Sequence, residues 1–152
     1  MNWSILRWFA RQVGLTDGRI FDPAFDGRMA EIQRPAKLPE GRVRIHFFAA
    51  DFETDAEAEL FCFGTGDPNK PEPITTELDG ATIDTAFVEV VRGNLAGRLS
   101  EFLSGDTVAD LMADRRGRNT LIFITEEAFS GLPFQVNDTD TLRYLGAHTV
   151  AT

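Results

Sequence analysis

The sequence predicts a single α+β domain, with a four-stranded, mostly antiparallel sheet and helices packed on one or both of its faces. Segments that alternate with a period of two are interspersed with segments of helical spacing, in the order α–β–α–β–α–α–β–β. The chain of 152 residues has the length of one domain and can bury a sizeable core without a disulfide or a metal. The hydrophobic fraction of 43% is ordinary for a globular protein.

Residues 1–41 are expected to form an N-terminal helix and a surface wrap that belong to the same domain as the α+β core of residues 42–152. Residues 2–15 predict an amphipathic helix, which can pack on the domain itself or dock a partner. Residues 16–41 contain three Pro and three Gly and predict a long surface connection. The apolar stripe of the helix consists of Ile5, Trp8, Phe9 and Val13.

The first part of the core predicts a strand followed by a helix. Residues 42–50 alternate between two faces and form the clearest strand of the chain. Thr54 and Glu57 have the spacing of a capping box, which marks the start of a helix. Apolar side chains follow at helical spacing as far as Phe63. Residues 64–73 are rich in Gly, Pro, Asp and Asn and predict a loop.

A second strand is expected over residues 86–91, and two helices follow it. Asn94 can cap the first of these helices, and the second begins at Asp106 or Thr107. The second helix is expected to end at residues 115–117, where two Arg at the negative pole of the helix precede a Gly.

The last two strands are expected to differ in burial. Residues 121–124 form an almost purely apolar run, which is typical of a central strand that is covered on both faces. Residues 142–149 alternate in polarity and predict the last strand of the sheet.

Negative charge is concentrated in the middle of the chain. Residues 51–89 carry eleven acidic side chains and one basic one, a net charge of −10, whereas the whole chain has a net charge of −9. Residues 1–50 have eight basic and five acidic side chains, and residues 90–152 have six and eight. A local field of one sign repels nucleic acid and attracts basic protein surfaces. The expected partner is therefore a basic protein and not a nucleic acid.

The sequence contains no strong catalytic or metal-binding motif. Cys62 lies between two Phe residues, as a buried and inert thiol would, and His46 alternates on its predicted strand as an ordinary sheet residue. Two distant His and one Cys do not have the number and spacing of ligands that a zinc site needs. We therefore expect no catalytic residue, no metal and no cofactor. Neighbouring carboxylates such as Glu126 and Glu127 leave open a small enzyme that uses a carboxylate pair, with or without a metal.

Asp84 and Glu89 flank the start of the second predicted strand, beside apolar residues. A carboxylate that is partly buried there needs a partner, because burying a charge without one is costly. The expected partner is Arg44 or Arg143. Such a pair can be a structural salt bridge or part of a recognition site.

The sequence predicts a cytoplasmic protein. Its one cysteine excludes an intramolecular disulfide and fits a reducing compartment. Charged and polar residues interrupt residues 1–15, so the segment lacks the apolar region of a signal peptide. No apolar run approaches the roughly 20 residues of a membrane span, and we expect no membrane association. The sequence does not indicate an oligomeric state.

Short motifs along residues 42–149 carry a resemblance to one family. They are Asp51-Phe52-Glu53-Thr54-Asp55-Ala56-Glu57, Ile83-Asp84-Thr85-Ala86-Phe87-Val88-Glu89, Asn119-Thr120-Leu121-Ile122-Phe123 and Leu142-Arg143-Tyr144-Leu145-Gly146. In these motifs the chain resembles the twenty-second immunity-protein family of bacterial polymorphic toxin systems. The resemblance implies a small cytosolic protein that binds and neutralises a cognate toxin.

Charge and resemblance together predict a stoichiometric protein-binding inhibitor and not an enzyme. A toxin that cuts nucleic acid has a basic cleft, because its affinity for phosphate is largely electrostatic. An acidic inhibitor can compete for that cleft and is steered to it. A scaffold or regulatory module that docks through the N-terminal helix remains an alternative. The expected partner-binding residues are Asp51, Phe52, Glu53, Asp55, Glu57, Glu59, Asp84 and Glu89, with Phe52 as an apolar anchor.

Overall fold

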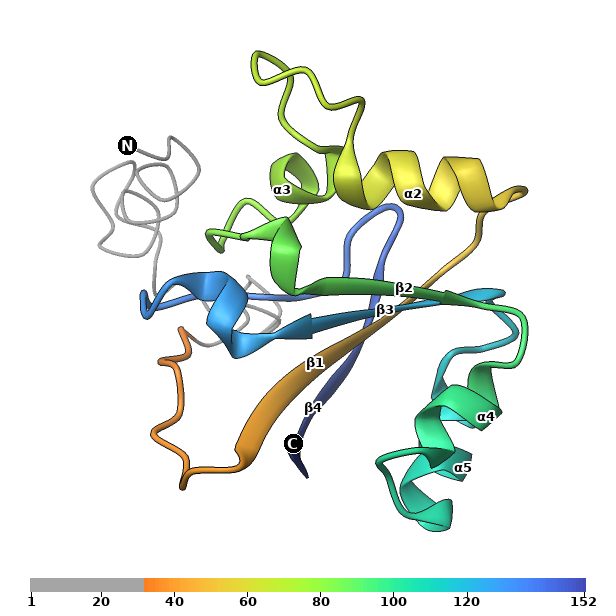
Figure 1. The fold of residues 1–152 in the computed structure, drawn as a ribbon. Helices are drawn as coiled ribbons and strands as arrows, with labels where there is room; N and C mark the ends of the chain where they lie inside the picture. The colour runs from red at the N-terminus through yellow and green to blue at the C-terminus, as the bar shows by residue number, and fades with distance from the viewer. Residues whose placement is uncertain (1–31) are drawn as a thin grey trace, which may run out of the picture.

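The computed structural model describes residues 32–152, which form one four-stranded sheet with helices on both faces (Figure 1). The predicted α+β class is therefore confirmed. The helix expected over residues 2–15 and most of the wrap expected over residues 16–41 lie outside the described residues. In the described part of the chain, no helix is long and apolar enough to cross a membrane.

The sheet is antiparallel throughout and has the strand order β2-β3-β1-β4. β1 and β3 are central, and β2 and β4 are the edges. The second half of β1 and residues 121–124 of β3 are apolar on both faces, as expected for strands that are covered on both sides. The strands are β1 (Arg42–Ala50), β2 (Val88–Arg92), β3 (Thr120–Thr125) and β4 (Arg143–Ala151).

Two pairs of helices cover the two faces of the sheet. In Figure 1, α2 (Asp55–Phe63) and α3 (Pro73–Glu77) lie above the sheet, and α4 (Leu95–Ser100) and α5 (Gly105–Asp114) lie below it. The sequence does not predict α3, which begins at the end of the expected loop. Its first residue is a proline, whose missing N–H is no loss at the first position of a helix.

Each face of the sheet carries its own hydrophobic core, because successive residues of a strand point to opposite faces. On the face covered by α2 and α3, Phe48 and Ile122 pack with Phe61 of α2. On the face covered by α4 and α5, Phe47 and Leu121 belong to the second core. The alternation in β1 therefore divides large apolar side chains between two cores.

Cys62 of α2 lies in the first of these cores and is fully buried. Burial raises the pKa of its thiol to about 12. Because the thiolate is the reactive form, this thiol is inert at neutral pH. The prediction of a buried and inert thiol is confirmed.

Two short 3-10 turns set the ends of the strands. Asp84 Oδ1 accepts a hydrogen bond from the backbone N–H of Ala86 at 3.0 Å and thereby caps η2 (Thr85–Phe87). The strand expected from residue 86 consequently begins two residues later, at Val88. The second turn, η3 (Glu126–Phe129), follows β3 directly.

Candidate protein-interaction surface

The residues with the densest acidic charge lie where the chain leaves β1 and enters α2. Thr54 Oγ1 accepts a hydrogen bond from the backbone N–H of Glu57 at 3.1 Å, and the Glu57 carboxylate accepts one from that of Glu53 at 3.0 Å. The predicted start of the helix is confirmed, and the second bond reaches one residue further back than in the usual capping box. We call residues 51–59 the acidic segment. Its five acidic residues are all exposed: Asp51, Glu53, Asp55, Glu57 and Glu59.

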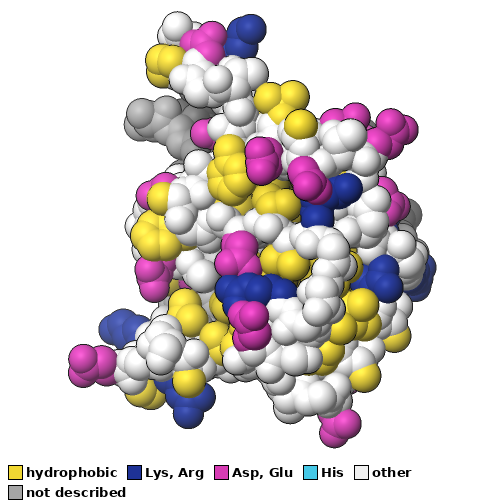
Figure 2. All heavy atoms as spheres, turned by 45° about the vertical axis from the view of Figure 1, so that its right-hand side comes forward, with side chains coloured by type: hydrophobic (Ala, Val, Ile, Leu, Met, Phe, Trp, Pro, Cys, Tyr) yellow, Lys and Arg dark blue, Asp and Glu magenta, His cyan; other side chains and the backbone are white. Residues whose placement is uncertain are grey.

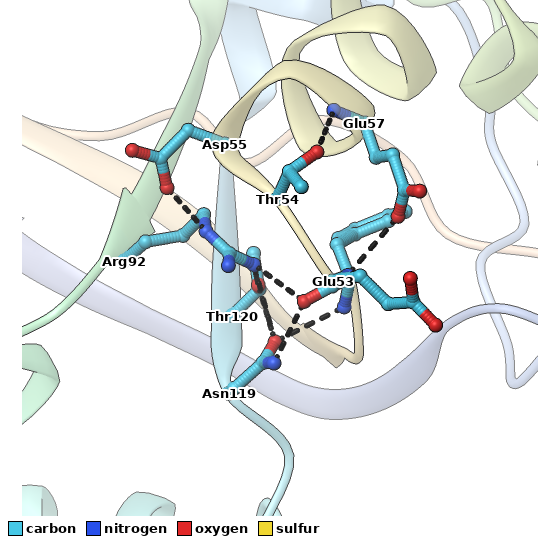
Figure 3. A network of polar contacts seen from close by, with 8 residues as sticks. Glu53, Thr54, Asp55, Glu57, Arg92, Asn119 and Thr120 are labelled. Atoms are coloured by element: carbon cyan, nitrogen blue, oxygen red, sulfur yellow. Dashed lines mark hydrogen bonds and ion pairs between the residues drawn. The ribbon is translucent and has the colours of Figure 1, made fainter.

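Arg92, the last residue of β2, holds the acidic segment in place (Figure 3). Its Nη1 donates to the backbone carbonyl of Phe52 at 3.1 Å and to Thr120 Oγ1 at 2.7 Å. Its Nε donates to Asp55 Oδ1 at 2.6 Å. Asn119 completes the frame, because its side chain donates to the Phe52 carbonyl at 2.8 Å and accepts from the Phe52 N–H at 3.1 Å. Side chains from two neighbouring strand ends thus fix the backbone of the segment.

The described residues neutralise the charge of the acidic segment only in part. Asp55 pairs with Arg92, and Asp51 Oδ1 accepts a hydrogen bond from the backbone N–H of Asn119 at 3.0 Å. The carboxylates of Glu53 and Glu59 have no hydrogen bond or ion pair with any described residue. Among residues 32–152, these five carboxylates thus share a single guanidinium, which leaves the segment a net charge of −4.

Phe52, the expected apolar anchor, packs on the interior of the protein. Its ring is half-buried against the first core and lies 5.4 Å from the ring of Phe61, measured between centroids. Phe63, at the last turn of α2, is 40% exposed. Phe63 therefore offers more apolar surface to a partner than Phe52 does.

Glu89 of β2 forms an ion pair with Arg98 of α4 and is not part of the acidic segment. Both of its carboxylate oxygens accept hydrogen bonds from Arg98, each at 2.9 Å, and Arg98 also pairs with Glu101. The hydrogen bonds that Arg98 donates to Glu89 raise the pKa of its guanidinium above the ordinary value. This group of three is a second charged cluster, on the opposite face of β2 from α2.

The arginines expected as partners of Asp84 and Glu89 bind elsewhere, so this prediction is wrong. Arg44 Nε lies 3.7 Å from the Glu126 carboxylate, and Arg143 Nη2 donates to a carboxylate of α5 at 2.7 Å. Asp84 itself caps η2, at the opposite end of β2 from the acidic segment. The structure therefore does not bring Asp84 together with the other predicted site residues.

A surface hollow of about 420 Å³ separates α2 from β2. Asp55 and Glu59, one helical turn apart, line it together with Phe63 on the side of α2. Val88 and Val90 line it on the side of the strand. Figure 2 shows acidic and hydrophobic side chains next to one another on this face, with basic side chains between them. The structure thus places part of the acidic segment beside an edge of the sheet, which periodicity alone does not predict.

A second polar cluster, which sequence reasoning missed, lies inside the protein. His46 of β1 is fully buried, with Nε2 at 3.1 Å from Glu126 Oε1 and Nδ1 at 2.8 Å from the Tyr144 hydroxyl. The rings of Phe129 and Phe134 meet the imidazole edge-on at centroid distances of 5.4 and 5.1 Å. Burial lowers the pKa of His46, so the imidazole is neutral at pH 7. We assign its proton to Nε2, which donates to Glu126 and leaves Nδ1 to accept from Tyr144.

Glu126 links this cluster to the segment that precedes β1. Its Oε2 accepts a hydrogen bond from the backbone N–H of Ala36 at 2.9 Å. Nearby, Gln33 and Phe134 exchange two backbone hydrogen bonds of 2.8 and 2.9 Å. The cluster therefore fastens the connection before β1 to the sheet. One feature of the sequence could have indicated this cluster. Glu126 directly follows the most apolar strand, where a buried charge needs a partner.

The described residues hold no candidate metal centre, and the imidazole of the His46 cluster is buried. Within residues 32–152, no group of three or more His, Cys, Asp or Glu side chains is placed to hold a metal ion. The imidazole of His46 is closed to solvent, with an exposed fraction of 0%. Comparison of the chain with protein-family models, with curated proteins and with solved structures finds no match.

Proposed function

We propose that this protein is a stoichiometric inhibitor that binds a basic partner protein through the acidic segment and converts no substrate itself. One observation carries the proposal. In the part of the chain that the structure describes, five exposed carboxylates of residues 51–59 share one guanidinium, that of Arg92, so most of their charge is available to another molecule. Exposed charges contribute little to stability, so these carboxylates are free to serve binding.

The frame around Arg92 supports a binding role because it fixes the surface before a partner arrives. Arg92 and Asn119 hold the backbone at Phe52, and the capping bonds of Thr54 and Glu57 hold the first turn of α2. A surface ordered in advance loses less conformational entropy on association. The free carboxylates therefore project from a rigid base.

The partner class that fits this surface is a protein with a basic cleft. A nucleic-acid-cleaving toxin, the class implied by the resemblance to immunity proteins, needs such a cleft to bind phosphate. Carboxylates compete with phosphate for the same cations, and opposite net charges accelerate encounter. The inhibitor would then act by covering the cleft in a one-to-one complex.

Salt dependence and charge reversal test this proposal on the full chain. The partner is sought by co-purification with the protein encoded beside this chain, followed by titration of the purified pair. We expect affinity to fall at least tenfold between about 50 and about 500 mM NaCl, because salt screens exposed charges. The double variant Glu53→Lys/Glu59→Lys should bind roughly tenfold more weakly or worse, mainly through a slower association rate.

Asp110→Lys is the matched control. Asp110 is an exposed acid on α5 that has no partner among the described residues, so its reversal changes the net charge by the same amount per site. We expect its affinity to stay within about twofold of the original. A complex that tolerates both high salt and the double reversal would refute the proposal.

A further inference from the structure

β2 is an edge strand of the described sheet. It pairs with β3 on one side, and no described strand lies on its other side. Apart from this pairing with β3, the backbone of residues 89–92 makes no hydrogen bond with any other residue of 32–152. The other edge strand differs, since the backbone N–H of Tyr144 in β4 already donates to Asp138 at 2.7 Å. An edge with unpaired backbone groups is a template for another strand.

The usual protections of a sheet edge are weak at β2. The strand contains no proline, and its register against β3 is regular, without a bulge. It does carry two charged residues, but both fold back onto the protein. Arg92 is only 19% exposed and binds Asp55 and Thr120, while Glu89 pairs with Arg98. Neither side chain is left free to repel an incoming strand.

Hollows line both faces of β2, so an added strand would have space for its side chains. On the α2 side is the hollow of about 420 Å³ that Asp55, Glu59 and Phe63 line. On the α4 side is a hollow of about 500 Å³, to whose lining Phe87 and Phe102 contribute apolar surface. The side chains of a strand point alternately to its two faces. Side chains on one face of the added strand would therefore meet carboxylates, and those on its other face would meet mainly apolar groups.

We propose that β2 accepts an extended segment of the basic partner as a fifth strand of the sheet. The inference rests on the proposed function and names the element of the partner that binds. Charge complementarity defines the segment: Lys or Arg at alternate positions would face Glu59 and Asp55, and the residues between them would be apolar. Backbone pairing supplies affinity in such strand addition, and the alternating side chains supply specificity.

A synthetic peptide of about eight residues that alternates Lys and Val, blocked at both ends, is the probe for strand addition. The control peptide has the same sequence with N-methyl groups on its backbone amides, which keeps the charge and removes the donors for pairing. We expect the control to bind the full chain at least about tenfold more weakly, since it cannot extend a sheet. Equal affinity of the two peptides would overturn the inference.

Hydrogen exchange shows where the peptide binds. We expect the parent peptide to slow the exchange of those amides in residues 88–92 that exchange fast in the free protein, by about tenfold or more. Unchanged exchange in β2 overturns the inference, even if the peptide binds elsewhere. Failure of the peptide to bind at millimolar concentration overturns it as well.

Charge variants separate this inference from the proposed function. Glu59→Lys should weaken peptide binding about fivefold, while Asp110→Lys should stay within about twofold. If the peptide fails but the basic partner still binds in a salt-dependent manner, strand addition is wrong and the proposed function stands. If the affinity for the partner changes neither with salt nor with charge reversal, the proposed function itself is wrong.

Discussion

The acidic segment and the His46 cluster each place a carboxylate beside a basic side chain, but the first carboxylate is exposed to solvent and the second is buried. The side chain of Asp55, which pairs with Arg92, is 82% exposed, whereas that of Glu126, which binds His46, is 8% exposed. An exposed ion pair adds little to stability, because water and salt compete with it. A buried acceptor matters more, since its loss leaves buried donors without partners. Exposure thus separates groups available for binding from groups that hold the fold.

Replacing the buried carboxylate should give the largest effect. Glu126→Ala leaves the Nε2–H of His46 buried without an acceptor and removes the bond to the backbone of Ala36. We expect the free energy of unfolding, measured with urea, to fall by about 3 kcal/mol. The control is Glu127→Ala, the exposed neighbour, which should change it by less than about 0.5 kcal/mol. Equal effects of the two variants would contradict the contrast between buried and exposed acids.

Removing the guanidinium that frames the acidic segment should have an intermediate effect. Arg92→Ala deletes bonds to Phe52, Thr120 and Asp55 at a side chain that is 19% exposed, and we expect a loss of about 1–2 kcal/mol in urea unfolding. Asp55→Ala removes the exposed ion pair alone and should cost less than about 1 kcal/mol. If both variants cost the same, the ion pair and not the backbone frame would be the stabilising element.

The pH dependence of stability should report the buried His46 cluster. Burial lowers the pKa of His46 below its ordinary value of 6.5, while Glu126 opposes and Arg44 reinforces that shift. Below pH 6.5 the unfolded chain therefore binds a proton that the folded protein does not bind. The free energy of unfolding should decrease as the pH falls from 6.5 towards the lowered pKa of the folded state.

His46→Gln tests this assignment, because glutamine is polar but does not titrate. Urea unfolding at several pH values between about 7.5 and 5.5 should show a smaller slope for this variant than for the original protein. An unchanged slope would assign the pH dependence to other groups.

Neutralising the free carboxylates should give the smallest change in stability. Glu53→Gln/Glu59→Gln removes two charges that have no partner in the described part of the chain. We expect the free energy of unfolding to change by less than about 0.5 kcal/mol in either direction, measured with urea. The same variant should weaken binding of the basic partner. A large loss of stability with unchanged binding would reverse the roles assigned to the two regions.

Local features were predicted from the sequence because their causes are local. The alternation of residues 42–50 gave β1, and the spacing of Thr54 and Glu57 gave the start of α2. The apolar run of residues 121–124 gave the central strand β3. The boundaries of the elements were less predictable. The cap formed by Asp84 moved the start of β2, and the unpredicted helix α3 begins at the last residue of an expected loop.

The candidate site was predicted in its charge but not in its geometry. The five acids of residues 51–59 are exposed on one short segment, yet Phe52 turns towards the core, and Asp84 lies at the far end of β2. The partners Arg92 and Arg98 were not identified. Arg92 lies 40 residues along the chain from Phe52, and a polar contact of that range leaves no periodic trace in a sequence.

The sequence by itself determined the four strands, the helices α2, α4 and α5, the inert cysteine and the local excess of negative charge, because periodicity, capping and composition act within a few residues. Only the tertiary structure decided which charges stay free. The strand order placed β2 at an edge beside the acidic segment, and it brought Glu126 to His46 across 80 residues of chain. Pairing between distant polar groups depends on how the strands are arranged in the sheet, and no local pattern encodes that arrangement.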